Sequence, residues 1–230
     1  MQRSKLTLRI FFVLVGLDLL ALLVGAAMAD LYLRPLTLLA LLVHGFMILP
    51  RPIRVGRLLI LIGLAAAVLV EAVQRLDVAF GIVVAGTAVY YLFYTLGFAL
   101  NKDGAYTWKS LLAFPLVAIY MVLMFLWLNP YGFTREPAMV YVLVATIMTG
   151  FALHPYISGN RGRVAMFLAA GVLLLLISDT TRSILIFKLY SDMGNTYLYN
   201  NLGEFIIMVF YFGGQFCVVQ SIGEPGESSV

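Results

Sequence analysis

Long apolar runs separated by short polar breaks constrain this chain more than any other feature of its sequence. Apolar side chains make up 63% of its 230 residues and charged side chains only 11%, whereas soluble domains carry about 25% charged residues. So few charges cannot cover a surface that faces water. Since a helix needs about 20 apolar residues to cross the hydrocarbon core of a bilayer, the pattern predicts an all-α integral membrane protein, a bundle of about eight transmembrane helices.

Short polar segments that contain Pro, Gly and Asn separate the apolar runs, as at 50–52, 101–104, 129–132 and 158–162. These are turn signals, and none of the gaps is long enough to hold a soluble domain. The sequence therefore predicts a single eight-helix transmembrane domain over 1–222 and a short polar tail over 223–230. The predicted spans are 7–29, 35–50, 57–76, 78–100, 109–128, 137–157, 163–187 and 199–222.

The basic residues are distributed unevenly between the two sides of the predicted bundle. Ten of the fifteen Lys and Arg residues lie in the N-terminal segment, or in the second, fourth and sixth connections and the span ends that flank them. Basic residues concentrate in cytoplasmic loops, so we expect both termini in the cytoplasm, in a multi-pass protein of a bacterial inner membrane. The net charge of +4 then reports orientation, and no nucleic-acid partner is expected.

Ionisable groups inside a membrane span cost free energy and are functional candidates by default. Glu71 follows Arg57 by 14 residues and Asp179 follows Arg163 by 16, which places both carboxyl groups about 21–24 Å along their helices at 1.5 Å per residue. They should therefore lie at similar depth. Five ionisable residues inside the spans stand out, and two amides join them: Asp18, His44, Glu71, Asp179 and Glu204, with Gln215 and Gln220.

Two carboxyl groups that face each other in an apolar site can act as a general acid and a general base without a metal. The alternative is an interfacial ion pair between Asp179 and Arg182, three residues later. The single cysteine, Cys217, excludes an intramolecular disulfide framework and a cysteine-based zinc cluster. Two histidines make a histidine-built metal centre a poor explanation, and we predict no metal and no cofactor. His44 is expected to be a hydrogen-bonded packing residue.

The segment from Gly171 to Phe187, GVLLLLISDTTRSILIF, resembles the G-x-x-x-F-x-x-S-D-x-x-x-A-x-x-x-F segment of the YhhN-like lysoplasmalogenase family. It keeps the Ser-Asp pair and the final Phe, whereas Leu175 and Ser183 replace the family's Phe and Ala. In the eighth span FYFGGQ is similar to the family's T-Y-Y-x-A-Q. The resemblance covers most of the chain and includes the number of helices.

Three further segments extend this resemblance. In the sixth span, PAMVYVLVATIMTGFA looks like the family's P-x-x-x-Y-x-x-x-x-x-x-M-x-x-x-A and keeps its tyrosine as Tyr141. GLAAAVLVE puts Glu71 where the family has an Asp. Tyr91 stands where the A-H-x-x-Y pattern has its His, and Arg34-Pro35 is similar to the Lys-Pro that opens the family's second helix.

The resemblance implies hydrolysis of the vinyl ether of lysoplasmalogens, lysoplasmenylethanolamine or lysoplasmenylcholine, to a fatty aldehyde and a glycerophospho-alcohol. Two acids would then protonate the ether and activate water, and these are Asp179 and Glu71. Four side chains would bind or orient the substrate or the water, and these are Tyr211, Gln215, Tyr91 and Tyr141. Arg34 would meet the substrate phosphate. The expected partners are the lysophospholipid and membrane lipid; the oligomeric state is left open.

Two other classes of function stay open on the sequence. One is a lipid-binding membrane protein without enzymatic activity that keeps the family fold. The other is a small transporter with Asp18, Glu71 and Asp179 as proton or cation sites, although residues 1–115 and 116–230 show no convincing repeat of the kind many transporters have. Neither a G-x-S-x-G elbow nor an H-E-x-x-H motif occurs in the sequence.

Overall fold

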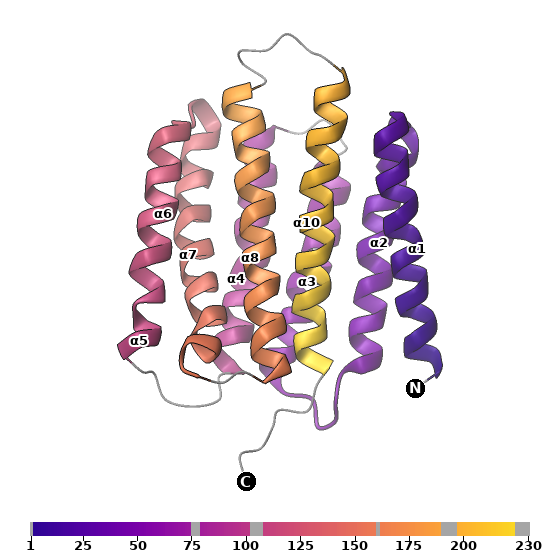
Figure 1. Cartoon of the computed structure of the whole chain (residues 1–230), viewed down its shortest axis with the longest axis vertical. Helices are drawn as coiled ribbons and strands as arrows, with labels where there is room; N and C mark the ends of the chain where they lie inside the picture. The colour runs from indigo at the N-terminus through magenta and orange to yellow at the C-terminus, as the bar shows by residue number, and fades with distance from the viewer. Residues whose placement is uncertain (1, 75–78, 102–107, 160–161, 190–196, 224–230) are drawn as a thin grey trace.

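The computed structural model is all helical and confirms the predicted membrane bundle of about eight helices (Figure 1). It describes residues 2–74, 79–101, 108–159, 162–189 and 197–223, so the predicted tail, apart from Gly223, lies outside the described residues. The elements are α1 (Gln2–Val24), α2 (Ala27–Ile48), α3 (Val55–Gln74), α4 (Phe80–Leu100), α5 (Trp108–Leu111), α6 (Ala113–Leu128), the 3₁₀ helix η1 (Gly132–Thr134), α7 (Arg135–Ile157), α8 (Arg163–Ile184), the π-helix η2 (Leu185–Leu189) and α10 (Tyr197–Gly223).

Six helical segments are long and apolar enough to cross a bilayer, and two shorter apolar helices, Tyr32–Ile48 and Ala113–Leu128, accompany them. Large apolar side chains such as Leu116, Leu123 and Leu126 of α6 point away from the protein. An outward-facing apolar surface of this kind suits lipid and not water. The chain is therefore a multi-pass integral membrane protein.

The boundary between the first two helices differs from the prediction. The first helix ends at Val24, because Gly25 adopts a left-handed φ of 71° and turns the chain, which glycine does at little cost. The second helix begins at Ala27 and includes Pro35, where the sequence predicted its start. The prediction was wrong here because the apolar run continues through the turn, and because transmembrane helices tolerate a proline in their interior.

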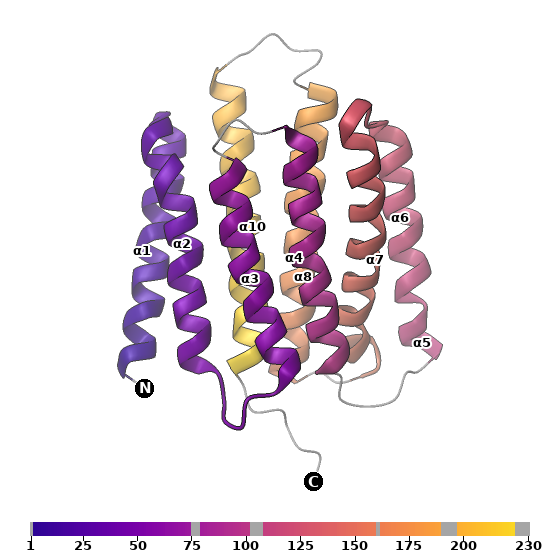
Figure 2. The ribbon, with the colours of Figure 1, turned by 180° about the vertical axis from the view of Figure 1, so that it is seen from behind.

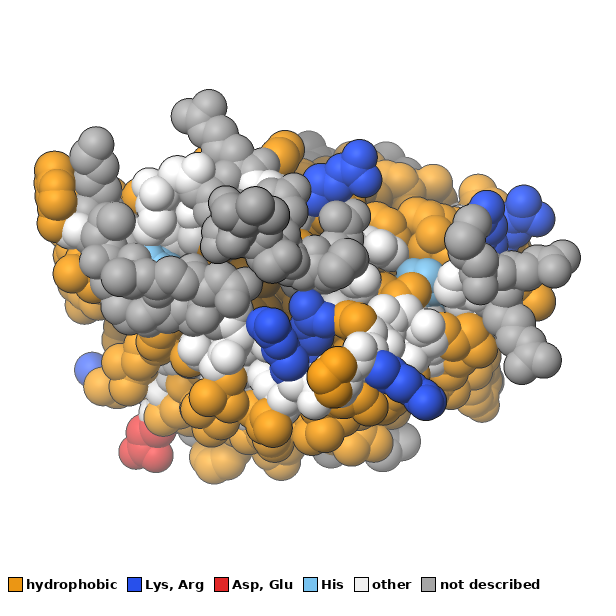
Figure 3. Space-filling model, turned by 90° about the horizontal axis from the view of Figure 1, so that it is seen from below, with side chains coloured by type: hydrophobic (Ala, Val, Ile, Leu, Met, Phe, Trp, Pro, Cys, Tyr) orange, Lys and Arg blue, Asp and Glu red, His pale blue; other side chains and the backbone are white. Residues whose placement is uncertain are grey.

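The helices run alternately up and down, so that α1 begins and α10 ends at the same end of the bundle (Figure 1). Lys and Arg side chains gather on this end (Figure 3), where Arg51, Arg54 and Arg163 are exposed. We call it the basic end; it is the end predicted to face the cytoplasm. The opposite half of the bundle is the distal half.

Five helices form the centre of the bundle. The helix α10 packs along α8, while α4 packs against both α3 and α7; Figure 2 shows α3 and α4 from behind, in front of α10 and α8. The hairpin of α1 and α2 lies on one side of this group, and α6 lies on the other (Figure 1). The central helices carry most of the polar residues inside the predicted spans.

Two glycines allow α8 and α10 to approach closely. A Cβ atom on Gly214 would lie 2.9 Å from the backbone oxygen of Gly171, and one on Gly171 would lie 3.0 Å from that of Gly214. Small residues at a helix crossing are a common device in membranes. Further along the same interface the hydroxyl of Ser178 donates to the backbone oxygen of Ile207 at 3.1 Å. This contact holds α8 against α10 at the residue that precedes Asp179.

Candidate active site

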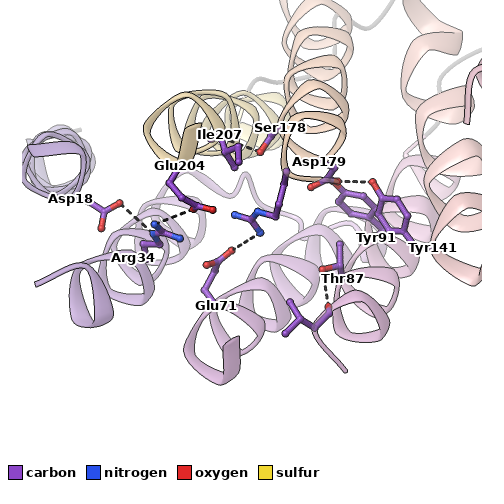
Figure 4. A network of polar contacts seen from close by, with 12 residues as sticks. Asp18, Arg34, Glu71, Thr87, Tyr91, Tyr141, Ser178, Asp179, Glu204 and Ile207 are labelled. Carbon is purple, nitrogen blue, oxygen red and sulfur yellow. Dashed lines mark hydrogen bonds and ion pairs between the residues drawn. The ribbon is translucent and has the colours of Figure 1, made fainter. Parts of the chain in front are cut away.

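Polar side chains from seven helices converge in the distal half of the bundle (Figure 4). Each arrives from a transmembrane helix, at a position more than halfway toward the distal end or close to the middle. Because no membrane-spanning segment can easily leave such groups in lipid, they pair with one another. The members are Asp18 of α1, Arg34 of α2, Glu71 of α3, Tyr91 of α4, Tyr141 of α7, Asp179 and Arg182 of α8, and Glu204 of α10.

Asp179 is held by two tyrosines from different helices. The hydroxyl of Tyr141 donates to its Oδ2 atom at 2.7 Å, and the hydroxyl of Tyr91 donates to the same oxygen. The two phenol rings lie 5.7 Å apart, and Tyr90 packs edge-on against Tyr91 at 4.6 Å. The rings fix the carboxyl group in one orientation. Since both hydrogen bonds end on Oδ2, the Oδ1 atom stays available for chemistry.

Glu71 lies beside Arg182 and not beside Asp179. Its side chain is 2% exposed, and its Oε1 atom is 3.9 Å from Nη1 of Arg182. The guanidinium also interacts electrostatically with Glu204 and Asp179, and it lies 5.9 Å above the ring of Tyr211. Arg182 therefore pairs with Glu71 of α3 and not with Asp179 of its own helix, which was the alternative predicted from the sequence. Arg182 is the cation that both candidate acids share.

Arg34 forms an ion cluster between α1, α2 and α10. Its Nη2 atom lies 3.4 Å from Oε2 of Glu204, and its Nε atom lies 3.9 Å from Oδ2 of Asp18. Arg34 is only 1% exposed. A guanidinium already flanked by two carboxyl groups and buried among helices is poorly placed for a substrate phosphate. The phosphate contact that the sequence predicted for Arg34 stays a prediction.

The two predicted residues of α10 lie on its buried face, one helical turn apart. Tyr211 lies beneath Arg182, whereas Gln215 is fully buried and accepts a 2.5 Å hydrogen bond from the hydroxyl of Tyr94. The amide nitrogen of Gln215 has no hydrogen-bond partner among the described residues. The structure therefore brings Tyr211 to the acids and places Gln215 on the side toward the basic end.

His44 lies outside this group of residues. Its Nδ1 atom is 3.1 Å from the hydroxyl of Thr7 and its Nε2 atom is 3.1 Å from the amide of Gln220, which joins α2 to α1 and α10. A buried imidazole with partners on both ring nitrogens ties helices together. The prediction that His44 is a hydrogen-bonded packing residue is confirmed.

Two adjoining grooves, both partly open to the outside, meet at Asp179. Both grooves share the wall formed by Ala138 and Tyr141 of α7, by Asp179 and Ser183 of α8, and by Phe187 of η2. Asp179 thus lies where the two grooves join.

The remaining walls distinguish the two grooves. The α6-side groove is completed by Met121, Met124, Phe125, Leu128 and Pro130, by Val142 and by Thr180. The α4-side groove is completed by Phe80, Val83, Val84 and Thr87 of α4 and by Arg182. One groove therefore offers an almost wholly apolar wall, and the other adds a cation and a hydroxyl.

Sequence reasoning missed two contributions to this site. From the sequence, Arg182 is only the partner in an alternative ion pair with Asp179, and Tyr94 is not among the predicted site residues. A basic residue within an otherwise apolar span is itself a signal, and it could have identified Arg182. Among the described residues, no group of three or more His, Cys, Asp and Glu side chains is arranged to hold a metal ion.

Residues 29–222 match the family model described as the YhhN family. The matched region includes all of the site residues named above except Asp18. No curated protein matches the chain, and no solved structure does.

Proposed function

The chain belongs to the YhhN family, which includes lysoplasmalogenases, and we propose that it hydrolyses the vinyl ether of lysoplasmalogens within the membrane. The observation that carries the proposal is the position of Asp179. It lies where two partly open grooves meet, it accepts hydrogen bonds from two tyrosines, and it shares Arg182 with a second acid, Glu71. A single-chain amphiphile would reach it from the bilayer, and we place both termini in the cytoplasm of a bacterial cell.

Cleavage of a vinyl ether begins with a proton transfer to carbon, and we assign this step to Asp179. The proton moves to the carbon atom that is β to the ether oxygen, and the other alkene carbon becomes an oxocarbenium ion. As Asp179 loses its proton, negative charge develops on its carboxyl group. The hydroxyls of Tyr91 and Tyr141 donate to that charge, and hydrogen bonds that strengthen in the transition state accelerate a reaction.

The second acid, Glu71, would activate the water. Arg182 beside it balances the charge of a carboxylate, so Glu71 is suited to act as the base. Water adds to the oxocarbenium carbon and gives its proton to Glu71, which forms a hemiacetal. Glu71 then protonates the ether oxygen while Asp179 takes the hemiacetal hydroxyl proton. The carbon–oxygen bond breaks to give the aldehyde and the glycerophospho-alcohol, and both acids return to their starting states.

The residues of α10 would support this arrangement indirectly. Tyr211 packs against Arg182 and would keep the cation between the two acids. Gln215, fixed by Tyr94, would orient a water molecule through its amide nitrogen.

The test is aldehyde release from lysoplasmenylethanolamine by the purified full chain in nanodiscs. Wild type should turn over, and Asp179→Asn and Glu71→Gln should each lose at least about a hundredfold in rate, the scale of general acid–base catalysis. Glu136→Gln, which changes an exposed carboxyl group at the start of α7, is the matched control and should keep the wild-type rate. Full activity in either site variant would remove that acid from the mechanism, and an inactive wild type would count against the enzyme.

A further inference from the structure

The two grooves that meet at Asp179 differ in chemistry in the same way as the two arms of a lysophospholipid. We propose that the α4-side groove binds the phosphate-bearing headgroup through Arg182 and that the α6-side groove takes the hydrocarbon chain. The assignment rests on the proposed function, because it takes the vinyl ether to be the group presented to Asp179. It replaces Arg34 by Arg182 as the residue that meets the phosphate.

Two nitrogen atoms of the Arg182 guanidinium donate no hydrogen bond to the described residues. Its Nε and Nη2 atoms are buried and have no hydrogen-bond partner among the described residues, and its contact with Glu71 is a long one at 3.9 Å through Nη1. A buried donor without a partner costs free energy, and a phosphate oxygen would satisfy it. Arg182 lines the α4-side groove and is not part of the α6-side lining, so this groove is the one suited to an anionic group.

The α4-side groove also reaches the distal end of the bundle. It extends from Asp179 past the shared Phe187 of η2 to Phe80, which lines this groove and not the α6-side groove. Phe187 packs against Phe80 at the distal start of α4, with ring centroids 6.0 Å apart. A headgroup in this groove would therefore lie between the reacting ether and the distal surface of the membrane.

Among the described residues that line the α6-side groove, the shared Asp179 is the one charged group. Its own wall consists of methionine, phenylalanine, leucine, proline and valine side chains with one hydroxyl, that of Thr180. That hydroxyl lies 2.8 Å from the hydroxyl of Tyr120, so it has a partner and does not demand one from a ligand. Flexible methionines such as Met121 and Met124 suit a chain of variable shape. The occupant that fits is an alkenyl chain.

The covalent order of the substrate matches the order of the grooves. In a lysoplasmalogen the vinyl ether is the junction between the hydrocarbon chain and the glycerophosphate. In the protein, Asp179 is the junction between the apolar groove and the groove that carries the guanidinium. A lipid with one arm in each groove therefore presents its scissile group to Asp179 without further requirements.

A matched pair of variants separates the two grooves. Val84→Phe fills the α4-side groove and Val142→Phe fills the α6-side groove, since each valine lines only one of them. The measurement is equilibrium binding to the full chain in nanodiscs of non-hydrolysable 1-O-alkyl lysophosphoethanolamines with dodecyl or octadecyl chains, and of the matching alkylglycerols. Binding does not require turnover, so a failure of the proposed reaction and a failure of this assignment can be distinguished.

Val142→Phe should weaken both octadecyl ligands about tenfold and change the dodecyl ligands less. Val84→Phe should weaken the lysophosphoethanolamines about tenfold and the alkylglycerols less than twofold. Arg182→Gln should show the same headgroup-dependent loss, because a charge-assisted hydrogen bond contributes about a factor of ten. Arg182→Lys should recover part of the affinity, and Arg135→Gln, at the exposed start of α7, should change nothing.

Equal losses for ligands with and without phosphate in Arg182→Gln would overturn the headgroup assignment. An effect of chain length in Val84→Phe but not in Val142→Phe would reverse the two grooves and so contradict the proposal. If Arg182→Gln does not fold, the valine pair alone decides, because both changes are conservative in polarity. Binding as expected in a wild type that releases no aldehyde would refute the hydrolase and leave the groove assignment standing.

Discussion

The two tyrosines that donate to Asp179 give the most direct measure of how this carboxyl group works. Replacing Tyr91 or Tyr141 by Phe removes one hydroxyl and keeps the ring. Both rings belong to an aromatic cluster with centroids 4.6–5.7 Å apart around Tyr91, so phenylalanine should preserve the packing. The variants therefore change the hydrogen bonds to Asp179 and little else.

The expected magnitude follows from the geometry. A hydrogen bond to a charged group contributes about 1.5–3 kcal/mol, and each ~1.4 kcal/mol of transition-state stabilisation is a factor of ten in rate. In the proposed mechanism the charge on Asp179 develops during proton transfer. Part of each bond is already present in the ground state, so we expect Tyr91→Phe and Tyr141→Phe each to lower kcat about tenfold. Because both hydroxyls donate to one oxygen, the double variant should fall short of the product of the two losses.

Aldehyde release can be followed continuously by coupling it to a dehydrogenase that reduces the product. Tyr120→Phe is the matched control, since it removes a phenol hydroxyl that bonds to Thr180, the neighbour of Asp179 in α8. It should keep kcat within about twofold. Wild-type rates in both Tyr91→Phe and Tyr141→Phe, with unchanged thermal unfolding, would refute the idea that these hydrogen bonds stabilise a developing charge.

Two predictions concern the framework of the site. Arg34→Met leaves Asp18 and Glu204 without their shared cation, and breaking a buried ion pair costs about 3–5 kcal/mol. The melting temperature in detergent should therefore fall clearly, whereas Arg54→Met at the exposed basic end should leave it unchanged. Equal melting temperatures for the two variants would contradict the stabilising role of Arg34. Gly214→Ala places a methyl group 2.9 Å from a backbone oxygen of α8, whereas the methyl group of Gly213→Ala meets its nearest atom at 3.5 Å. Only Gly214→Ala should lower both the melting temperature and the rate of aldehyde release. An equally large effect of Gly213→Ala would show that helix separation is not the cause.

The fold could be predicted from the sequence because lipid imposes a simple requirement. Every backbone polar group must be satisfied within its own segment, so apolar length and turn signals are enough to predict eight crossings. The exception, at the first turn, arose where Gly25 and Ala26 are as apolar as a helix interior, and only the backbone conformation marks the break. Composition cannot locate such a turn.

The partners of the polar residues could not be predicted in the same way. Depth along the helices correctly placed Glu71 and Asp179 in the same half of the bundle, but depth says nothing about rotation around each helix axis. The rotation of each helix decides that Arg182 lies beside Glu71 of α3. It also decides that Tyr91 of α4 and Tyr141 of α7 both bond to Asp179. These contacts depend on which helices are adjacent, which is a property of the packed bundle.

The first helix contributes to the site although the family match begins at residue 29. Asp18 is fully buried and lies beside Arg34, which in turn lies beside Glu204 of α10. Glu204 interacts with Arg182 as well, and α10 also supplies Tyr211 beneath that guanidinium. A change at Asp18 therefore alters the charge that balances Arg34, and through Glu204 it alters the field at Arg182. For this reason the charges of the site have to be considered as one connected set that extends from α1 through α2 and α10 to α8, and not as an isolated pair of acids.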